Sequence, residues 1–186
     1  MKLHTIICST RPGRIGPAIA QWFHDAAVAH GAFECELVDL AEFNLPIFNE
    51  PRHPRMGQYE FEHTKKWAAS VAAADAFAFV TPEYNFYAPP AMVNAIDYLS
   101  NEWQGKAATL VSYGGVSGGL RAAQSAKGLL TSVGVMPIPQ GVGLPMAMQA
   151  VKDGKFAGGE QADSGAKAAL DALAKWAAAL KTMRAS

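Results

Sequence analysis

A polar loop over residues 9–16 carries the hydroxyl and guanidinium groups that bind a phosphate. It follows a short apolar, β-branched segment and precedes a segment with helical spacing that begins at Pro17. Proline suits the first turn of a helix because its missing N–H would have no partner there. Such a loop offers free backbone N–H groups at a helix N-terminus. Its side chains add hydroxyl donors from Ser9 and Thr10 and cationic donors from Arg11 and Arg14. These residue types predict an anion site, although an exposed turn with surface arginines would have the same composition.

A second chemistry fits the same loop, because Cys8 and Arg14 stand in the Cys-x-x-x-x-x-Arg spacing that cysteine phosphatases use. There a thiolate lies beneath a phosphate that backbone amides and an arginine hold. Pro12 removes one amide, Ile15 replaces the usual hydroxyl residue, and no later Asp-Pro supplies a general acid. These three departures from the phosphatase pattern favour Cys8 as the last buried residue of a strand.

Two further loops have compositions suited to a planar ligand. Residues 81–90 combine three prolines with three aromatic side chains, and such a stiff loop can present its amides and an aromatic face to a heteroaromatic ring. Residues 112–119 contain four glycines, which allow a ligand to approach the backbone closely. Alone, each pattern also fits an ordinary corner or a bare glycine-rich turn.

Alternating strands and helices must position these loops. The apolar patterns predict strands over 3–8, 33–40, 76–80, 107–112 and 135–139, and helices over 17–31, 60–74, 90–99, 120–132 and 163–183. Most strand starts are spaced like βαβ units, which predicts a mostly parallel sheet covered by helices on both faces. The two prolines of 135–139 confine that strand to an edge. We expect residues 141–159 to form a loop, and Leu170, Leu173, Trp176 and Leu180 to face the core.

Ligands of such sheets bind beyond the carboxyl ends of the strands. The loops at 9–16, 82–89 and 112–119 each follow a strand directly, so the topology predicts that they meet at one edge.

Composition excludes several classes of protein. The 186 residues are 50% hydrophobic, and 16 Lys and Arg balance 16 Asp and Glu, which is not the basic footprint of a nucleic-acid binder. Two cysteines cannot form a disulfide scaffold, and no apolar run resembles a signal peptide or a membrane span. We expect one domain over 1–186, in the cytoplasm.

Taken together, the three loops resemble those of the NADPH-dependent FMN reductase family. The matching segments are Ser9-Thr10-Arg11, Pro82-Glu83-Tyr84-Asn85 and Ser112-Tyr113-Gly114-Gly115, with further similarity over 89–97. The resemblance extends from about residue 3 to residue 140. It implies a flavodoxin-like α/β three-layer sandwich with a five-stranded parallel sheet in the order 2-1-3-4-5.

The resemblance also implies FMN as cofactor, NADPH or NADH as co-substrate, and a homodimer or homotetramer with the flavin near the interface. The FMN phosphate and ribityl chain would be held by Ser9, Thr10, Arg11, Ile15 and Gly16. The isoalloxazine would be lined by Pro82, Glu83, Tyr84 and Asn85, and its pyrimidine end by Ser112, Tyr113, Gly114 and Gly115. Arg14, and also Arg11, are candidates for the extra phosphate of NADPH.

The reaction implied is ping-pong hydride transfer from NAD(P)H to FMN and then to a quinone, flavin, azo compound or metal oxyanion. It needs no catalytic acid or base from the protein, because the flavin supplies the chemistry. The alternatives are a non-enzymatic flavodoxin-type electron carrier, which is typically acidic where this chain is neutral, and a redox-sensing flavoprotein.

Three other features of the sequence also lead to predictions. The five histidines show no spacing for metal ligands, so we predict no metal site. Trp103 lies in a connection, where a role at a subunit interface is one interpretation. The proline-rich segment 45–59 is a candidate lid or dimer contact.

Overall fold

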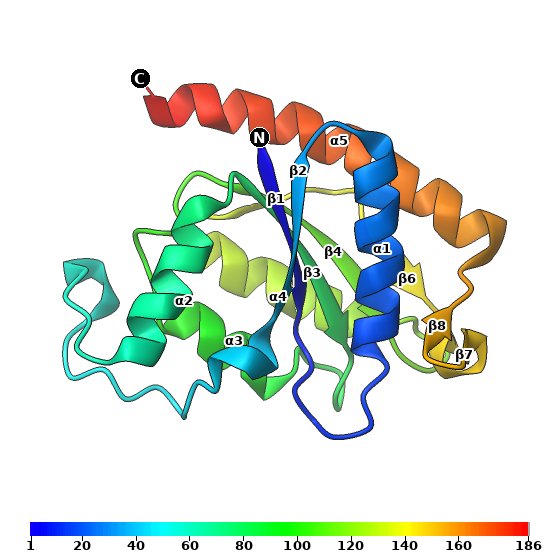
Figure 1. The fold of residues 1–186 in the computed structure, drawn as a ribbon, viewed down its shortest axis with the longest axis horizontal. Coiled ribbons are helices and arrows are strands. Elements are labelled where there is room, and N and C mark those ends of the chain that lie inside the picture. Colours follow the sequence, from blue (N-terminus) through cyan, green and yellow to red (C-terminus); the bar gives the residue numbers. More distant parts are fainter. Residues whose placement is uncertain (186) are drawn as a thin grey trace.

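A parallel β-sheet between two layers of helices forms the core of the computed structural model, which describes residues 1–185 (Figure 1). The main strands follow the order β2-β1-β3-β4-β5, which confirms the expected order. Their bounds are β1 Lys2–Ile7, β2 Glu34–Asp39, β3 Ala76–Pro82, β4 Ala107–Tyr113 and β5 Met136–Pro137. Because every pairing among them is parallel, their carboxyl ends lie at the same edge, at the bottom of Figure 1.

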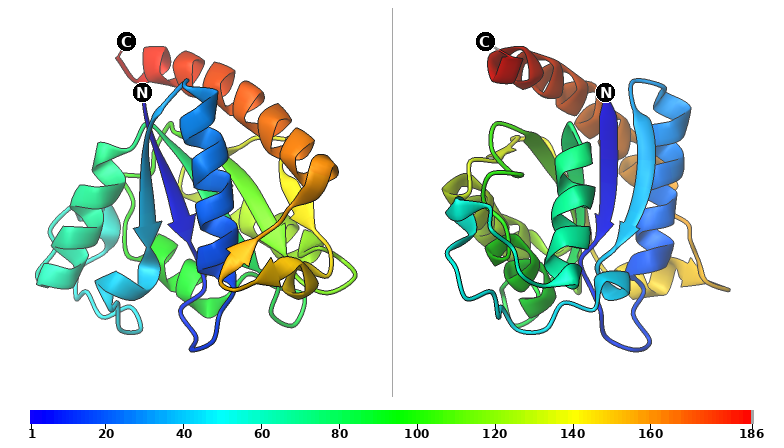
Figure 2. Two further views of the ribbon diagram at one scale, coloured as in Figure 1. Left: turned by 45° about the vertical axis from the view of Figure 1, so that its right-hand side comes forward. Right: turned by 60° about the vertical axis from the view of Figure 1, so that its left-hand side comes forward.

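Within residues 1–185, five helices cover the two faces of the sheet. They are α1 Gly16–His30, α2 Glu62–Ala73, α3 Pro90–Asp97, α4 Leu120–Ser132 and α5 Gly159–Ala185, with 3-10 turns η1 Leu40–Phe43, η2 Pro54–Met56 and η3 Ala147–Ala150. Helices α1 and α5 pack on one face, and α2, α3 and α4 on the other (Figure 2). Helix α1 ends at Gly31, whose left-handed φ of 76° closes the helix as the sequence predicts.

Side chains that alternate along the strands pack into two hydrophobic cores, one on each face of the sheet. Leu3 and Ile7 of β1 point into the core under α1 and α5, whereas Ile6 points into the core under the other helices. Strands β3 and β4 are buried along their whole length, as expected for central strands covered on both faces.

The segment after β5 differs from the prediction. Residues 141–159 are not a plain loop, because Val142–Leu144 forms a further strand, β6, that pairs in parallel with Val111–Tyr113. The two-residue β5 covers only the beginning of β4, so β6 satisfies the backbone groups that β5 leaves unpaired. The rest includes η3 and a small hairpin of β7 Val151–Lys152 and β8 Lys155–Phe156.

Two predictions about tryptophans are wrong. Trp103 is fully buried against Trp67 and Phe77 and donates its ring N–H to the Ile96 carbonyl over 3.2 Å, so it cannot lie at a subunit interface. Trp176 is 39% exposed, because Ala177 and Leu173 of α5 face the core instead. Periodicity alone did not determine the rotation of α5.

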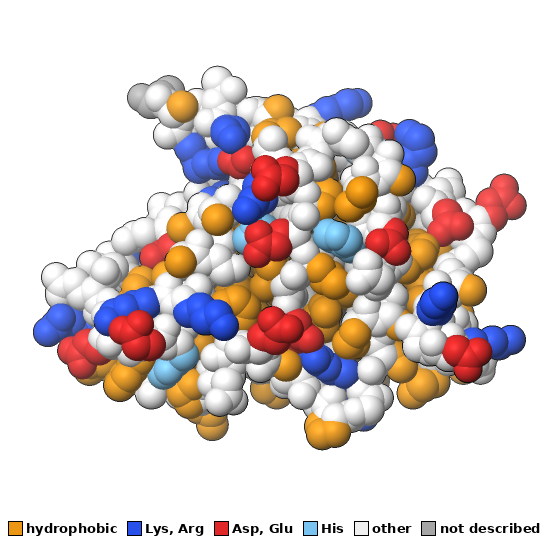
Figure 3. Space-filling view, viewed as in Figure 1, with side chains coloured by type: hydrophobic (Ala, Val, Ile, Leu, Met, Phe, Trp, Pro, Cys, Tyr) orange, Lys and Arg blue, Asp and Glu red, His pale blue; other side chains and the backbone are white. Residues whose placement is uncertain are grey.

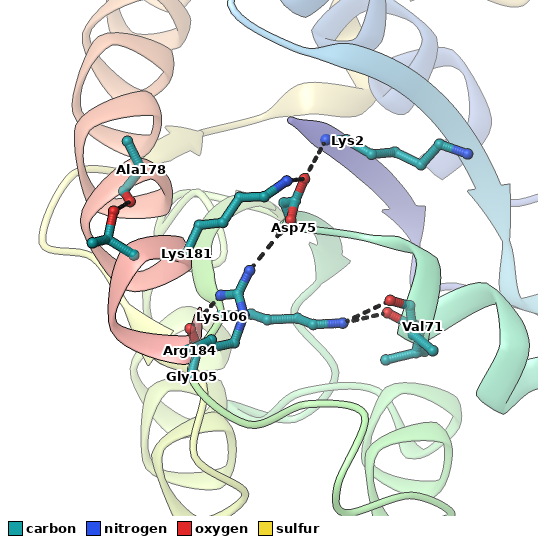
Figure 4. A network of polar contacts seen from close by, with 10 residues as sticks. Lys2, Val71, Asp75, Gly105, Lys106, Ala178, Lys181 and Arg184 are labelled. Atoms are coloured by element: carbon teal, nitrogen blue, oxygen red, sulfur yellow. Dashed lines mark hydrogen bonds and ion pairs between the residues drawn. The ribbon is translucent and has the colours of Figure 1, made fainter. Parts of the chain in front are cut away.

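A network of charged groups closes the amino edge of the sheet (Figure 4). Asp75 accepts hydrogen bonds from the backbone N–H of Lys2, from Lys181 and from Arg184, over 2.9, 2.9 and 3.3 Å. Lys106 extends beneath α2 and donates to the carbonyl of Val71 over 2.8 Å. The network attaches the end of α5 to the sheet.

The proline-rich segment 45–59 is held by several contacts. Asn94 accepts from Phe48 N–H over 2.8 Å and donates to the Pro46 carbonyl over 2.7 Å. The buried Glu50 carboxylate accepts from the backbone N–H groups of Glu60 and Phe61, at the start of α2. These contacts disfavour a role as a lid. Among residues 1–185, no helix is long and apolar enough to cross a membrane.

Candidate functional site

A cavity of about 430 Å³ lies at the carboxyl edge of the sheet. It is formed by the loops after β1, β3, β4 and β6, and its lining residues are Arg11, Ile15, Pro82, Glu83, Tyr84, Tyr113, Gly114, Gly115, Met146, Met148 and Gln149. Its volume is within the range of small-molecule sites. A larger open groove of about 850 Å³ lies between 48–55 and 131–134, and none of the predicted site residues lines it.

The structure brings the three predicted loops together, although not every predicted residue lines the cavity. The predicted residues on its wall are Arg11, Ile15, Pro82, Glu83, Tyr84, Tyr113, Gly114 and Gly115. The predicted residues that lie behind or beside the wall are Ser9, Thr10, Gly16, Asn85 and Ser112. Thr10 lines a separate cavity of about 270 Å³, next to Ala41 and Ala91.

Beneath the cavity, a close contact joins the first and third loops. Tyr113 donates its hydroxyl to Ser9 Oγ over 3.1 Å, and burial raises the pKa of Tyr113, so the hydroxyl keeps its proton. A Cβ at Gly16 would lie 2.4 Å from Ser9 Oγ and 2.7 Å from the Tyr113 hydroxyl. Only glycine therefore lets α1 begin at this position.

The first loop leaves one arginine available to a ligand. Arg14 is bound by Asp39, with Nη1 and Nη2 donating to the carboxylate over 2.7 and 2.5 Å, and it also donates to the Ser9 carbonyl. Arg14 thus holds the loop, and the expectation that it meets NADPH is not supported. Arg11 lines the cavity, and its side chain forms no ion pair or hydrogen bond within residues 1–185.

The start of α1 also has free hydrogen-bond donors. Ile15 precedes the helix without a side-chain cap, and the first turn contains no acidic residue. Free N–H groups at a helix N-terminus, beside an unpaired guanidinium, favour a bound anion such as a phosphate.

The position of Cys8 contradicts the phosphatase alternative. Its side chain is fully buried, its N–H donates to the Val80 carbonyl over 3.0 Å, and burial raises the pKa of the thiol. A thiolate nucleophile needs a lowered pKa and access to the substrate, and Cys8 has neither.

The second loop forms a tight turn at the cavity. Tyr84 and Tyr87 exchange two backbone hydrogen bonds of 3.0 Å, and the residues between them, Asn85 and Phe86, have left-handed φ angles of 50° and 68°. Left-handed backbone is common for Asn and unfavourable for Phe. The left-handed backbone of Phe86 therefore requires a stabilising contact from a residue outside the turn.

The carboxylate of Glu83 is held by the start of α4. It accepts hydrogen bonds from the Arg121 side chain, from Ser117 and from the backbone N–H of Arg121 at the start of α4. Burial pushes the pKa of Glu83 upward, but these donors outweigh burial and hold it below the ordinary value. Glu83 is therefore ionised at neutral pH and joins the second loop to α4.

The glycines of the third loop are needed for close packing. Gly119 has φ 78°, and a Cβ there would lie 2.7 Å from the backbone nitrogen of Tyr113. Ser112 is turned inward and donates to the Gly118 carbonyl over 2.9 Å, so Gly114 and Gly115 form the cavity surface.

The wall of the cavity that follows β6 was not predicted from the sequence. Met146, Met148 and Gln149 follow β6, a strand that the composition of 141–159 did not indicate. Met146 N–H donates to the Gly115 carbonyl over 2.9 Å, which fixes this wall to the third loop. Only the topology could have indicated this wall, because any strand that pairs in parallel with β4 ends at the carboxyl edge of the sheet.

The cavity fits FMN in size and in chemistry. Arg11 and the uncapped start of α1 suit a phosphate, while Ile15, Tyr84, Met146 and Met148 suit a planar apolar ring. Hydrophobic side chains also reach the surface along this edge of the molecule (Figure 3). No group of three or more His, Cys, Asp or Glu side chains within residues 1–185 could hold a metal ion.

The sheet order and a ligand cavity at its carboxyl edge define a flavodoxin-like α/β protein. Sequence comparison gives a narrower class, because the profile of NADPH-dependent FMN reductases matches residues 1–149. The chain belongs to the NADPH-dependent FMN reductase family.

Individual relatives agree with this assignment. An NAD(P)H-dependent FMN reductase of a Nectria species is 35% identical over 164 residues, which cover 82% of each chain. A Schizosaccharomyces pombe protein of the same description is 43% identical over 125 residues, and the match spans 66% of this chain and 62% of that relative. Among solved structures, the Paracoccus denitrificans flavoenzyme NAD(P)H:(acceptor) oxidoreductase FerB has a TM-score of 0.75 at 23% identity, covering 95% of this chain and 96% of that one.

Proposed function

We propose that the protein binds FMN in this cavity and uses it to transfer electrons from NAD(P)H to a small-molecule acceptor. The observation that carries the proposal is that one cavity combines an apolar wall and the glycine loop with Arg11, whose side chain has no hydrogen bond or ion pair in the described part of the chain. When bound, FMN supplies the hydride chemistry, so the protein needs no catalytic acid or base.

In this proposal each loop has a separate task. Arg11 and the first turn of α1 bind the phosphate, and the buried contact between Ser9 and Tyr113 keeps that turn in place. Tyr84 and the backbone of Gly114 and Gly115 hold the ring on its two sides.

NAD(P)H and the acceptor would occupy the exposed mouth of the cavity in turn. Sharing one position gives ping-pong kinetics and tolerance of several acceptor types, such as quinones, flavins, azo compounds or metal oxyanions.

An electron carrier of flavodoxin type is less well supported. Carriers of this type are typically acidic, whereas this chain has formal net charge zero. A redox-sensing flavoprotein would have the same cavity. Only a measurement of NAD(P)H oxidation with an acceptor distinguishes it from an enzyme.

An absorption spectrum of the purified protein tests the proposal, recorded with FMN and then with NADPH under anaerobic conditions. We expect the visible bands of bound oxidised flavin, and their loss on adding NADPH. Bound flavin that NADPH leaves oxidised would favour the carrier or the sensor, and no binding of FMN would contradict the proposal.

We also propose a homodimer or homotetramer in the cytoplasm. Phe86, Tyr87 and Met148 are exposed apolar side chains at or near the cavity, and clusters of this kind mark interaction surfaces. Both cysteines are free thiols, which suits a reducing compartment. Sedimentation equilibrium tests the assembly, and a monomer at all concentrations would contradict it.

A further inference from the structure

Arg121 contacts the second loop at two points, although it does not line the cavity. Its Nε and Nη2 donate to Glu83 Oε1 over 2.8 and 2.6 Å, and its guanidinium carbon lies 3.8 Å from the centre of the Phe86 ring. One planar side chain thus binds residues on both sides of Tyr84, by a charged pair and by stacking on an aromatic face.

Helix stability does not explain an arginine at this position. Arg121 lies in the first turn of α4, where the helix dipole disfavours a cation. Its side chain is also 50% exposed. The contacts to Glu83 and Phe86 are therefore the physical reason for a guanidinium here.

These contacts act where the backbone is least favourable. Phe86 has a left-handed φ of 68° and is mostly exposed, so no burial of its ring in the core holds it there. The stacked guanidinium supplies the missing partner. On the other side, Arg121 is the cation that compensates the nearly buried carboxylate of Glu83.

We infer that Arg121 is a positioning residue that holds the Tyr84–Tyr87 turn in its binding conformation before FMN arrives. The inference rests on the proposed function, because it takes this turn as one wall of the FMN site. Without Arg121 the turn samples other conformations, and the apparent affinity for FMN falls with the fraction of molecules that remain competent.

The test compares Arg121→Met with Lys127→Met, which removes a cation elsewhere on the same helix. The dissociation constant of FMN is measured by fluorescence titration of the full-length protein freed of flavin. We expect Arg121→Met to weaken FMN binding about tenfold and Lys127→Met to leave it unchanged. At saturating FMN, kcat should stay within about twofold, because the ligand then holds the turn.

A second substitution separates positioning from a general structural role. Asn adopts left-handed backbone readily, so Phe86→Asn lets the turn form without the stacked arginine. In the Phe86→Asn protein, Arg121→Met should weaken FMN binding only about threefold, because only the Glu83 contact is lost.

Three outcomes would overturn the inference. Equal FMN binding by wild type and Arg121→Met would do so while leaving the proposed function intact. An equal loss in the presence and absence of Phe86→Asn would show that stacking on Phe86 does not hold the turn, and the inference would fail. Absence of FMN binding by the wild-type protein would overturn both the proposed function and this inference.

Discussion

The two edges of the same sheet use charged side chains in opposite ways. At the amino edge, Asp75 binds Lys181, Arg184 and the backbone of Lys2, so these charges are satisfied within the protein. At the carboxyl edge, Arg11 faces a cavity without a partner in residues 1–185. The amino edge therefore contributes to stability, and the carboxyl edge keeps its binding capacity for a ligand. Substitutions at the two edges should separate stability from binding.

The largest effect is expected from Gly16→Ala at the carboxyl edge. The new Cβ would overlap Ser9 Oγ and the Tyr113 hydroxyl, so the first loop must move. We expect a loss of about 2 kcal/mol in the free energy of unfolding and about a 100-fold loss of FMN affinity. Urea unfolding and fluorescence titration measure the two effects.

Gly128→Ala is the matched control. Gly128 lies in α4 and its Cβ would meet no atom within 4 Å, so the substitution should stabilise the protein by about 0.5–1 kcal/mol. Wild-type FMN affinity in Gly16→Ala would show that the first loop does not form the site.

Asp75→Ala should affect only the amino edge. It leaves Lys181 and Arg184 without their carboxylate, and we expect a loss of about 2 kcal/mol in the free energy of unfolding. FMN affinity should not change. A large change in FMN affinity would show that the two edges of the sheet are coupled and do not separate stability from binding.

Alkaline pH tests the amino edge through Lys106. Burial lowers the pKa of Lys106 to about 8 in the folded protein, whereas the unfolded chain keeps this proton up to pH about 10.4. Between these values the unfolded state binds more protons, so the free energy of unfolding rises with pH. From pH 8 to about 10, wild type should gain about 2 kcal/mol relative to Lys106→Met.

Other groups that titrate in this range are present in both proteins, so the difference between wild type and Lys106→Met isolates Lys106. Parallel stability curves would show that Lys106 has an ordinary pKa.

The smallest effect is expected from Arg11→Met. FMN affinity should fall about tenfold, which corresponds to about 1.4 kcal/mol, with stability unchanged. Riboflavin lacks the phosphate, so its affinity should be the same in wild type and variant. Arg55→Met, which removes another exposed arginine, is the control. An equal loss for riboflavin and FMN would show that Arg11 does not bind the phosphate.

Local sequence patterns predicted the main elements and the edge of the sheet at which the candidate cavity lies. Pro17 and Gly31 bound α1, and the buried strands predicted over 76–80 and 107–112 are mostly apolar. Because loops that follow parallel strands meet at one edge, the convergence of three loops could be predicted. The fourth wall could not, since β6 forms by pairing with β4 and carries little strand signal of its own.

Residue types predicted where the loops lie better than they predicted the contacts of individual side chains. Arg11 and Arg14 lie in the same loop and have the same side chain. Only Arg14 donates hydrogen bonds to Asp39, a residue at the end of β2. Trp103 was interpreted as a subunit-interface residue because it lies in a connection, but it is buried because that connection folds back under α2 and α3.

The sequence by itself determined the alternation of strands and helices, the sheet order through a recognisable family pattern, and the loops that meet at the carboxyl edge. These depend on periodicity, on glycine and proline positions, and on the geometry of parallel sheets, all of which are local or topological. Only the tertiary structure decided which charges are satisfied internally and which face the cavity. The physical reason is that the ion pairs Glu83–Arg121 and Arg14–Asp39 form only when segments distant in the sequence pack together.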